Sequence, residues 1–440
     1  MHDSEQVHNR FKEGLPVFLE NDPHLLSLSR LQYQHAPDWW KDIPVQAYGI
    51  YILSGGRQVG KSTSVKLFIA DCIQTKRFLP EHILYLPCDE IFDAKDLSQR
   101  IRRFVDTCQG HPFLLAIDEV TFVPHWDRII KSLADEGHFT RGLCLLTGSD
   151  TLILKEASMS FPGRRGESDQ TDFHVYPLSF KEYVALVQKT EPPAHDALPG
   201  LFQNYLQTGG YLRAINDFAS HGAVLPATYH TYEQWIRGDF LKRGKNEAYL
   251  LALLQALFTV GISQISYSAL THKIGLMSKE TCLDYCELLK RMDILFDLEA
   301  FDQNKKRGFP KKDRKFHFQD PFIQRTLYQW LRREGYIESQ DFEPALIEST
   351  VASHCHRFAK TYYFKGHGEI DVIYVKDSLV YAVEVKWSTQ LRPNDLKMLK
   401  QFPNSIIVTK SPQSGIMDGI PVMPVWQFLI TSCFALAQAF

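Results

Sequence analysis

Hydrophobic positions in the first part of the chain form short apolar runs separated by polar and helical stretches. Residues 47–54 (AYGIYILS) are an apolar run of the kind that a buried parallel strand shows, and residues 62–73 have helical spacing. Further apolar runs occupy residues 82–89, 112–120 and 143–150. This order predicts an α/β domain built on a parallel sheet.

The middle of the chain has a helical pattern from about residue 201 to 258, and residues 262–291 predict a helix-turn-helix. Ser278 is a natural N-cap for the second helix, residues 279–291. That helix is expected to bury Cys282, Leu283, Cys286 and Leu289 and to leave outside Lys279, Thr281, Tyr285 and Lys290. A hairpin of residues 294–301 and 315–318 would complete a winged helix.

Composition excludes several classes of protein. A formal charge of −2 gives no global attraction to nucleic acid or membrane, so any such attraction must come from local patches. The eight cysteines include no C-x-x-C pair and are expected to be reduced core residues of a cytoplasmic protein. The N-terminus is polar and the apolar run at residues 426–440 is too short to span a bilayer, so we expect neither a signal peptide nor a membrane segment.

A phosphate-binding motif lies between the first strand and the first helix of the predicted sheet. The sequence GGRQVGKST matches G-x-x-x-x-G-K-[ST], and such a loop directs backbone N–H groups and a helix N-terminus toward a polyphosphate. Lys61 is expected to bridge the β- and γ-phosphates, and Ser62 to give its hydroxyl to Mg²⁺. The residues expected to contact ATP are Gly55, Gly56, Arg57, Gln58, Val59, Gly60, Lys61, Ser62 and Thr63.

A second motif is the apolar run FLLAI followed by Asp118 and Glu119. Asp118 would hold Mg²⁺ through water and Glu119 would act as the general base that polarises the attacking water. Taken alone, this pattern is also typical of a strand that meets a surface loop. Downstream of a phosphate-binding loop, however, it predicts the residues that hold Mg²⁺ and activate water in a nucleotide site.

Three polar residues farther along could complete the site. Ser149, at the end of the run at residues 143–150, would either sense the γ-phosphate or cap a helix. Arg164 and Arg165 would act as a finger on a neighbouring subunit's γ-phosphate, or form an ordinary solvated pair.

These segments resemble prokaryotic AAA-type ATPases that carry a winged-helix segment and a C-terminal domain of the PD-(D/E)XK nuclease superfamily. The matching pieces are GGRQVGKST, LLAIDE, LLTGSD, the GR of FPGRRG, VYPLSFKEY and TGGYLRAI, and they extend over almost the whole chain. The resemblance supports Lys61, Ser62, Asp118 and Glu119 as nucleotide-site residues. It also implies that Arg164 or Arg165 contributes.

The loop of the predicted wing is strongly basic. Seven of the eleven residues at 305–315 are basic: Lys305, Lys306, Arg307, Lys311, Lys312, Arg314 and Lys315. Such a cluster would follow DNA phosphates, and each contact would release about one counterion. A solvated loop and a protein-contact surface are the alternatives.

The C-terminal part carries a candidate nuclease site on two predicted strands, residues 369–375 and 379–386. Glu384 and Lys386 point to the same strand face, and Asp371 on the paired strand can approach Glu384. Two close carboxylates favour Mg²⁺ or Mn²⁺ between them, and a lysine could activate a metal-bound water. The pattern resembles the D-x(n)-E-x-K core of the PD-(D/E)XK superfamily, and Glu348 matches the extra acidic residue of its resolvase-like members. A surface salt bridge, or a fold used only for binding, is the alternative.

Together these features predict a helical lead-in (1–46), an AAA-type ATPase domain (47–190), a helical and winged-helix domain (201–335) and a nuclease-like α/β domain (340–440). The expected function is ATP binding and hydrolysis with Mg²⁺, coupled to remodelling or movement on DNA. Duplex or branched DNA, including four-way Holliday junctions, is the expected partner. A homo-oligomer such as a ring is expected because arginine fingers act in trans. The alternatives are a nucleotide-gated switch or scaffold with a silent nuclease-like domain, and a DNA-binding module with a nearly silent ATPase.

Overall fold

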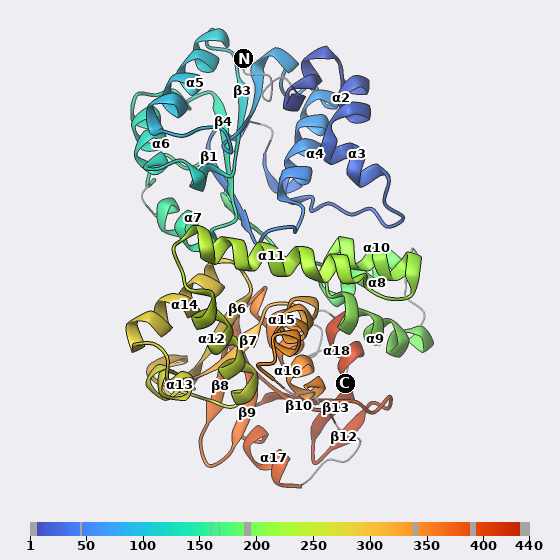
Figure 1. The fold of residues 1–440 in the computed structure, drawn as a ribbon. Coiled ribbons are helices and arrows are strands. Elements are labelled where there is room, and N and C mark those ends of the chain that lie inside the picture. Colours follow the sequence, from blue (N-terminus) through green and yellow to red (C-terminus); the bar gives the residue numbers. More distant parts are fainter. Residues whose placement is uncertain are drawn as a thin grey trace. The chain divides into compact units, whose positions relative to one another are not determined.

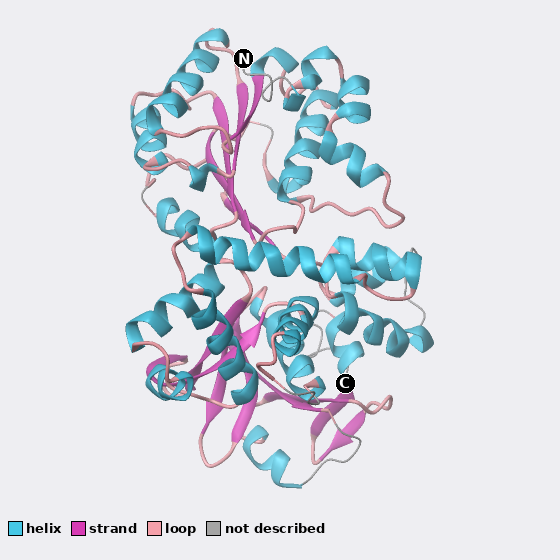
Figure 2. Cartoon of the chain, in the orientation of Figure 1, coloured by secondary structure: helices cyan, strands magenta, loops and turns pink. Residues whose placement is uncertain are grey.

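The computed structural model describes residues 7–44, 46–159, 161–166, 168–188, 195–337, 342–387 and 393–431. The chain forms two compact units, Met1–Tyr176 and Pro177–Phe440, which we call unit 1 and unit 2 and describe separately. Figure 1 shows the elements of each unit, and Figure 2 shows that the strands gather into two sheets.

Unit 1 is built on a five-stranded parallel sheet in the order β2-β3-β4-β1-β5, which is typical of P-loop ATPases. Its strands are β1 (Gly49–Gly55), β2 (Ile83–Pro87), β3 (Phe113–Asp118), β4 (Gly142–Gly148) and β5 (Asp172–Val175). Strand β4 lies between β1 and β3, as expected for an ATPase sheet with a strand inserted between the two motifs. Every residue of β3 and β4 is buried, which is why both read as continuous apolar runs.

Helices cover both faces of this sheet (Figure 1). They are α2 (Leu15–Asn21), α3 (Pro23–Ser29), α4 (Lys61–Gln74), α5 (Ala94–Thr107), α6 (Trp126–Asp135) and α7 (Thr151–Ser158). The N-terminal segment is anchored to α4, because Lys66 and Asp22 form an ion pair of 3.1 Å with both side chains fully buried. The Trp39 indole N–H also donates to Ser64 Oγ at 3.0 Å. The lead-in is therefore part of the core of unit 1.

Unit 2 starts with helices and continues into a mixed sheet. Its helices are α8 (Phe180–Gln188), α9 (Leu198–Thr208), α10 (Leu212–His221), α11 (Pro226–Lys242), α12 (Glu247–Val260), α13 (Tyr267–Ile274), α14 (Lys279–Arg291), α15 (Pro321–Arg333), α16 (Glu343–His356), α17 (Pro393–Leu399) and α18 (Val425–Ile430). Its strands are β6 (Leu295–Asp302), β7 (Arg307–Phe318), β8 (Lys360–Lys365), β9 (Glu369–Lys376), β10 (Leu379–Lys386), β11 (Asn404–Thr409), β12 (Gly415–Met417) and β13 (Ile420–Pro424).

One eight-stranded sheet, in the order β12-β13-β11-β10-β9-β8-β6-β7, joins the two halves of unit 2. The connection is a short parallel pairing of β6 with β8, in which Glu299 lies opposite Tyr362 and Ala300 opposite Tyr363. The hairpin of the predicted wing and the strands of the predicted nuclease-like domain are consequently continuous. Side chains on β7 can therefore reach residues on α16 and β9.

The structure corrects two details of the predicted helix-turn-helix. Helix α14 has the predicted bounds and Ser278 caps it, since Ser278 Oγ accepts from Thr281 N at 3.2 Å. Tyr285, however, is buried, and its hydroxyl accepts from Asn246 N at 2.6 Å. Lys290 is not free either, because it forms a 2.7 Å ion pair with Asp297 on β6. Packing of α14 against the elements around it buries positions that helical spacing alone placed outside.

The hairpin also differs from the prediction. Strand β7 begins at Arg307, so the connection to β6 consists of residues 303–306 and much of the predicted loop is strand. Arg314 is paired with Asp297 and Glu299 on β6. Lys315 is 1% exposed, so it does not belong to the basic surface. Five basic residues remain exposed: Lys305, Lys306, Arg307, Lys311 and Lys312. We call these five residues the basic wing.

Two expectations about composition can be compared with the structure. Seven cysteines are free and buried, in agreement with reduced core residues, and Cys433 lies outside the described residues. Among the described helices, none combines the length and the apolar character needed to cross a bilayer.

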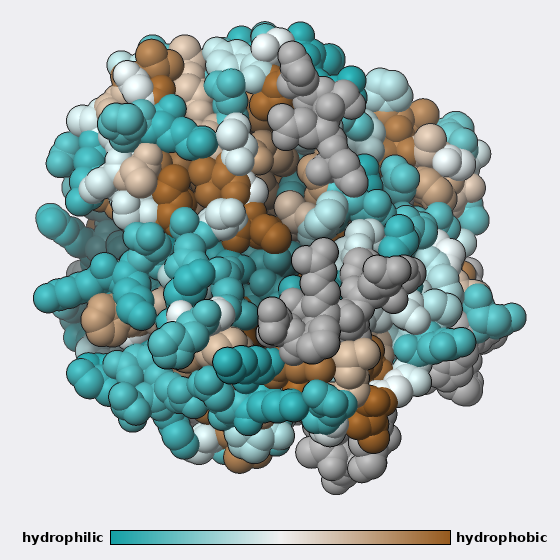
Figure 3. All heavy atoms as spheres, turned by 90° about the horizontal axis from the view of Figure 1, so that it is seen from below, coloured by the Kyte–Doolittle hydropathy of each residue, from teal (hydrophilic) through white to brown (hydrophobic). Residues whose placement is uncertain are grey.

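The face drawn in Figure 3 is largely hydrophilic, with smaller apolar areas between the polar side chains.

Candidate functional site

The phosphate-binding loop connects β1 to α4 and has the conformation that its glycines permit. Gly55 has φ +151°, and a Cβ there would lie 2.4 Å from the carbonyl oxygen of Val175 on the neighbouring strand β5. Gly60, with φ +94°, comes directly before α4 and provides no side-chain cap. The first N–H groups of α4 are thus left for another acceptor, as in helix N-termini that bind phosphate. Gln58 also has a positive φ of 62°.

Lys61 lies inside this loop and is 5% exposed. Its ammonium donates to the carbonyl oxygens of Gly55 at 2.8 Å and Gly56 at 2.7 Å. It also lies 3.9 Å from Glu119 Oε1. The loop therefore encloses a positive charge that its own carbonyls hold in place. Of the other loop residues, Arg57 lies over the Phe122 ring, Val59 packs on the core of the α4 face, and Thr63 is half-buried.

Three hydroxyl groups converge on Asp118 at the end of β3. Ser62 Oγ donates to Asp118 Oδ2 at 2.7 Å, and Tyr85 OH donates to the same oxygen at 2.5 Å. Thr147 Oγ1 donates to Asp118 Oδ1. Burial, and then the negative charge of Asp118, raise the pKa of Tyr85 far above its ordinary value. Tyr85 consequently remains a donor, and the carboxylate is fixed beside Ser62.

Glu119 is held next to Asp118 by the end of β4. Ser149 donates to Glu119 Oε2 through both its backbone N–H and its hydroxyl, each at 3.0 Å. The Glu119 N–H donates to Thr147 Oγ1 at 3.1 Å, and Glu119 has a left-handed φ of 53°. The cap of α7 is provided by Asp150, whose Oδ1 accepts from Ile153 N at 3.2 Å. Ser149 therefore contacts Glu119, and Asp150 rather than Ser149 caps α7.

A buried lysine lies behind this site and was not predicted. The Lys66 ammonium is 3.6 Å from the centre of the Tyr85 ring and donates to the His8 carbonyl at 2.6 Å. Burial lowers the pKa of Lys66 to about 8 in spite of Asp22. Neither Tyr85 nor Lys66 has a signal in the sequence. Thr147 does, because it belongs to the polar end of the run at residues 143–150, where a hydroxyl is expected beside the γ-phosphate.

Both candidate finger arginines make contacts within unit 1. Arg164 is ion-paired with Asp135 at the end of α6. Arg165 pairs with Asp172 at 2.7 Å and donates to the Thr171 carbonyl at 2.8 Å. A role as a finger requires one of these pairs to break first.

In unit 2, the predicted nuclease residues are brought together around a lysine. Lys315 Nζ on β7 lies 3.0 Å from Glu348 Oε1, 2.5 Å from Glu369 Oε1 and 3.2 Å from Asp371 Oδ1. Glu384, on β10, interacts electrostatically with Asp371, whose Oδ2 accepts from Val385 N at 2.9 Å. We call Glu348, Glu369, Asp371 and Glu384 the carboxylate cluster. Sequence spacing gave no signal for Lys315 or Glu369 as members of this site.

The charges of the cluster are strongly coupled. Burial, followed by repulsion from Asp371, raises the pKa of Glu384 to about 8 and raises the pKa of Glu348 well above its ordinary value. Burial opposes the charge of Lys315, but the surrounding carboxylates outweigh burial and raise its pKa. Lys386 lies 2.7 Å from Glu384 Oε1. In the described part of the chain, no three His, Cys, Asp or Glu side chains are arranged to hold a metal ion.

Comparisons with known proteins cover the chain in three parts. Residues 47–184 match the family described as an AAA domain, which identifies a nucleotide-binding domain that usually works with Mg²⁺. Residues 200–334 and 343–428 match two families described as domains of unknown function, DUF8612 and DUF4143. The uncharacterized protein MJ1637 of Methanocaldococcus jannaschii is 21% identical over 346 residues, which are 71% of this chain and 68% of that protein.

Two solved structures are similar at low identity. The Walker-type ATPase paby2304 of Pyrococcus abyssi has a TM-score of 0.45 and 13% identity, over 64% of this chain and 91% of that one. The ORC1 protein of Aeropyrum pernix, solved in complex with DNA, has a TM-score of 0.35 and 11% identity, over 76% of this chain and 94% of that one.

Proposed function

We propose that the chain binds Mg-ATP in unit 1 and hydrolyses it, and that it uses this energy on DNA bound by unit 2. The observation that carries the ATPase proposal is the convergence of four groups on one sheet edge. Lys61 and Ser62 begin α4, Asp118 ends β3, and Glu119 directly follows it. The Ser62–Asp118 hydrogen bond at 2.7 Å links the two motifs. The AAA match over residues 47–184 supports the same site.

The residues present suit a magnesium-bound triphosphate. The bound Mg²⁺ would neutralise phosphate charge during hydrolysis. Lys61 would exchange the carbonyls of Gly55 and Gly56 for phosphate oxygens, while the uncapped start of α4 offers its N–H groups. Ser62 and Asp118 are the residues that would hold the ion. Glu119 would accept a proton from water after Ser149 releases its carboxylate.

The test is ATP binding and hydrolysis by the full chain and by three variants. Lys61→Ala should lose nucleotide binding, whereas Glu119→Gln should keep it and lose about 10² to 10⁴ in kcat because the general base is gone. Lys95→Ala, an exposed lysine on α5, is the matched control and should leave both unchanged. An unmodified protein that takes up no Mg-ATP, or a Lys61→Ala variant equal to it, would refute the proposal.

DNA contact is assigned to the basic wing. Its five exposed side chains lie within eight residues of one hairpin. Arg314 and Lys315 do not belong to the basic wing, because both are paired with carboxylates. Reversing the five charges should weaken duplex binding and reduce the magnitude of the salt slope by up to about 4.5, because each lost phosphate contact removes about 0.9 from it. Reversal of the exposed Lys95 and Lys131 in unit 1 is the control. An unchanged slope would mean that the wing makes no phosphate contacts.

Metal-dependent DNA cleavage is a second candidate function, favoured by the position of Glu348, Asp371, Glu384 and Lys386 on the neighbouring elements α16, β9 and β10. Lys315 would have to leave Glu348 and Asp371 before these carboxylates could hold an ion. Carboxylates with a nearby lysine are suited to holding Mg²⁺ or Mn²⁺ for phosphodiester hydrolysis. Incubation with duplexes and a four-way junction, with each metal and with or without ATP, tests it. Cleavage that disappears in both Asp371→Ala and Lys386→Ala would support it. Cleavage that persists in both belongs to a contaminant.

A further inference from the structure

The Lys315 ammonium occupies the centre of the carboxylate cluster. An ammonium has three N–H donors, and three carboxylate oxygens from Glu348, Glu369 and Asp371 lie within 3.2 Å of it. The lysine comes from β7, whereas the carboxylates come from α16 and β9, so the contact is made only in the folded unit. Lys315 is 1% exposed, so its ammonium is compensated by these carboxylates and not by bulk water.

The cluster has more acceptor oxygens than Lys315 can satisfy. Glu384 is 5% exposed, and its Oε2 atom is buried without a hydrogen-bond partner. A buried carboxyl oxygen without a partner costs free energy, and a bound cation would relieve that cost. Carboxylate oxygens from several elements around one point are what a hard divalent cation prefers.

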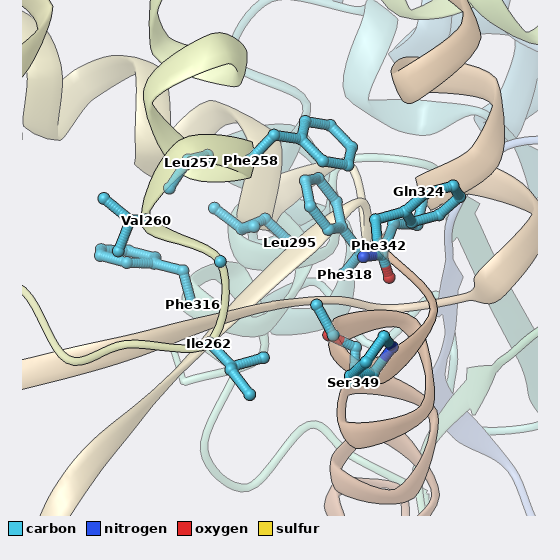
Figure 4. Close-up of a pocket in the computed structure, with 13 residues that line it drawn as sticks. Leu257, Phe258, Val260, Ile262, Leu295, Phe316, Phe318, Gln324, Phe342 and Ser349 are labelled. Atoms are coloured by element: carbon cyan, nitrogen blue, oxygen red, sulfur yellow. The ribbon is translucent and has the colours of Figure 1, made fainter. Parts of the chain in front are cut away.

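Strand β7 borders a cavity next to Lys315. Lys315 and His317 face α16, with His317 Nδ1 lying 3.2 Å from Ser349 Oγ. The alternate residues Phe316 and Phe318 line a cavity of about 230 Å³ (Figure 4). A strand with a cavity beside it can shift without compressing packed atoms. The same strand carries the exposed Lys311 and Lys312.

We propose that the Lys315 ammonium and a divalent cation are alternative occupants of the carboxylate cluster, so that Mg²⁺ or Mn²⁺ enters only when β7 withdraws Lys315. The two charges cannot share the site, because both require the same oxygens and they repel each other. The exchange couples the position of strand β7 to the binding of metal in the carboxylate cluster. The exchange rests on the metal site proposed for the second candidate function. It requires neither ATP hydrolysis nor DNA cleavage, so metal exchange can fail while either activity is present, or occur while both are absent.

The experiment measures Mn²⁺ binding to the full chain without nucleotide, from the loss of the free-ion paramagnetic resonance signal. Lys315→Met removes the competing charge and should create one additional Mn²⁺ site per chain, with a dissociation constant lower than that of the unmodified protein by about tenfold or more. Lys312→Met, on the same strand but exposed, should bind Mn²⁺ as the unmodified protein does. Adding Asp371→Asn to Lys315→Met should abolish the new site, which would locate it in the cluster.

A second measurement covers the case in which Lys315→Met is unstable, since it leaves the carboxylates without their cation. Mn²⁺ should then raise the Tm of Lys315→Met by several degrees and leave that of Lys312→Met nearly unchanged. The inference is overturned if the unmodified protein binds Mn²⁺ as tightly as Lys315→Met. It is equally overturned if Lys315→Met gains no site, or stays unfolded in saturating Mn²⁺.

Discussion

Tyr85→Phe is the sharpest test of the nucleotide site, because it deletes one hydroxyl that only the structure connects to Asp118. Tyr85 is 1% exposed and Asp118 is 7% exposed, and their hydrogen bond is 2.5 Å long. A hydrogen bond to a charged group contributes about 1.5 to 3 kcal/mol. Asp118 keeps the hydroxyls of Ser62 and Thr147, so we expect a loss near the lower end, about 1.5 kcal/mol.

Two assays measure this loss. Amide hydrogen exchange of β2 and β3 should report a lower opening free energy for unit 1 by about 1.5 kcal/mol. Isothermal titration should show Mg-ATP binding weakened by up to about tenfold, since 1.4 kcal/mol corresponds to a factor of ten. Tyr48→Phe, which removes a hydroxyl from a partly buried tyrosine packed on the same core, is the control. If Tyr85→Phe changes neither quantity, or if Tyr48→Phe changes both equally, the hydroxyl does not position Asp118.

Three further predictions concern other contacts. Gly209→Ala should destabilise unit 2 by about 3 kcal/mol or more in urea unfolding, because φ is +52° and a Cβ would lie 1.9 Å from an aspartate oxygen. Gly222→Ala is the control, since φ is +70° but the space around it is open, and it should cost only about 1 kcal/mol. Equal losses in the two variants would contradict a steric clash at Gly209. Burial lowers the pKa of His354 to about 3, so the unfolded chain binds the extra proton below pH 6.5 and stability falls by up to about 1.4 kcal/mol per pH unit between pH 6.5 and 3. Urea unfolding of His354→Gln should show a shallower slope over that range, and an unchanged slope would contradict this assignment. Ser149→Ala should change the kcat of ATP hydrolysis several-fold at nearly constant Mg-ATP affinity, since it removes one of two donors to Glu119, and steady-state kinetics that match the unmodified protein would exclude a catalytic role for this contact.

The sequence by itself determined those features that depend on spacing within one element. The phosphate-binding loop, β3 with its terminal acidic pair, α14 with its Ser278 cap, and β10 with Glu384 and Lys386 were all predicted within a few residues of their bounds. Local periodicity and glycine conformation are properties of neighbouring residues, so they can be read without knowing the rest of the fold.

Tertiary structure alone decided which polar groups meet. Tyr85 and Thr147 reach Asp118 because β2 and β4 flank β3 in the sheet, which no spacing along the chain encodes. Lys315, the last member of a basic run in the sequence, is buried among carboxylates because the pairing of β6 with β8 brings β7 against α16. The charge of a lysine is fixed by its chemistry, but its partner and its exposure are set by sheet order and register between segments far apart in the chain.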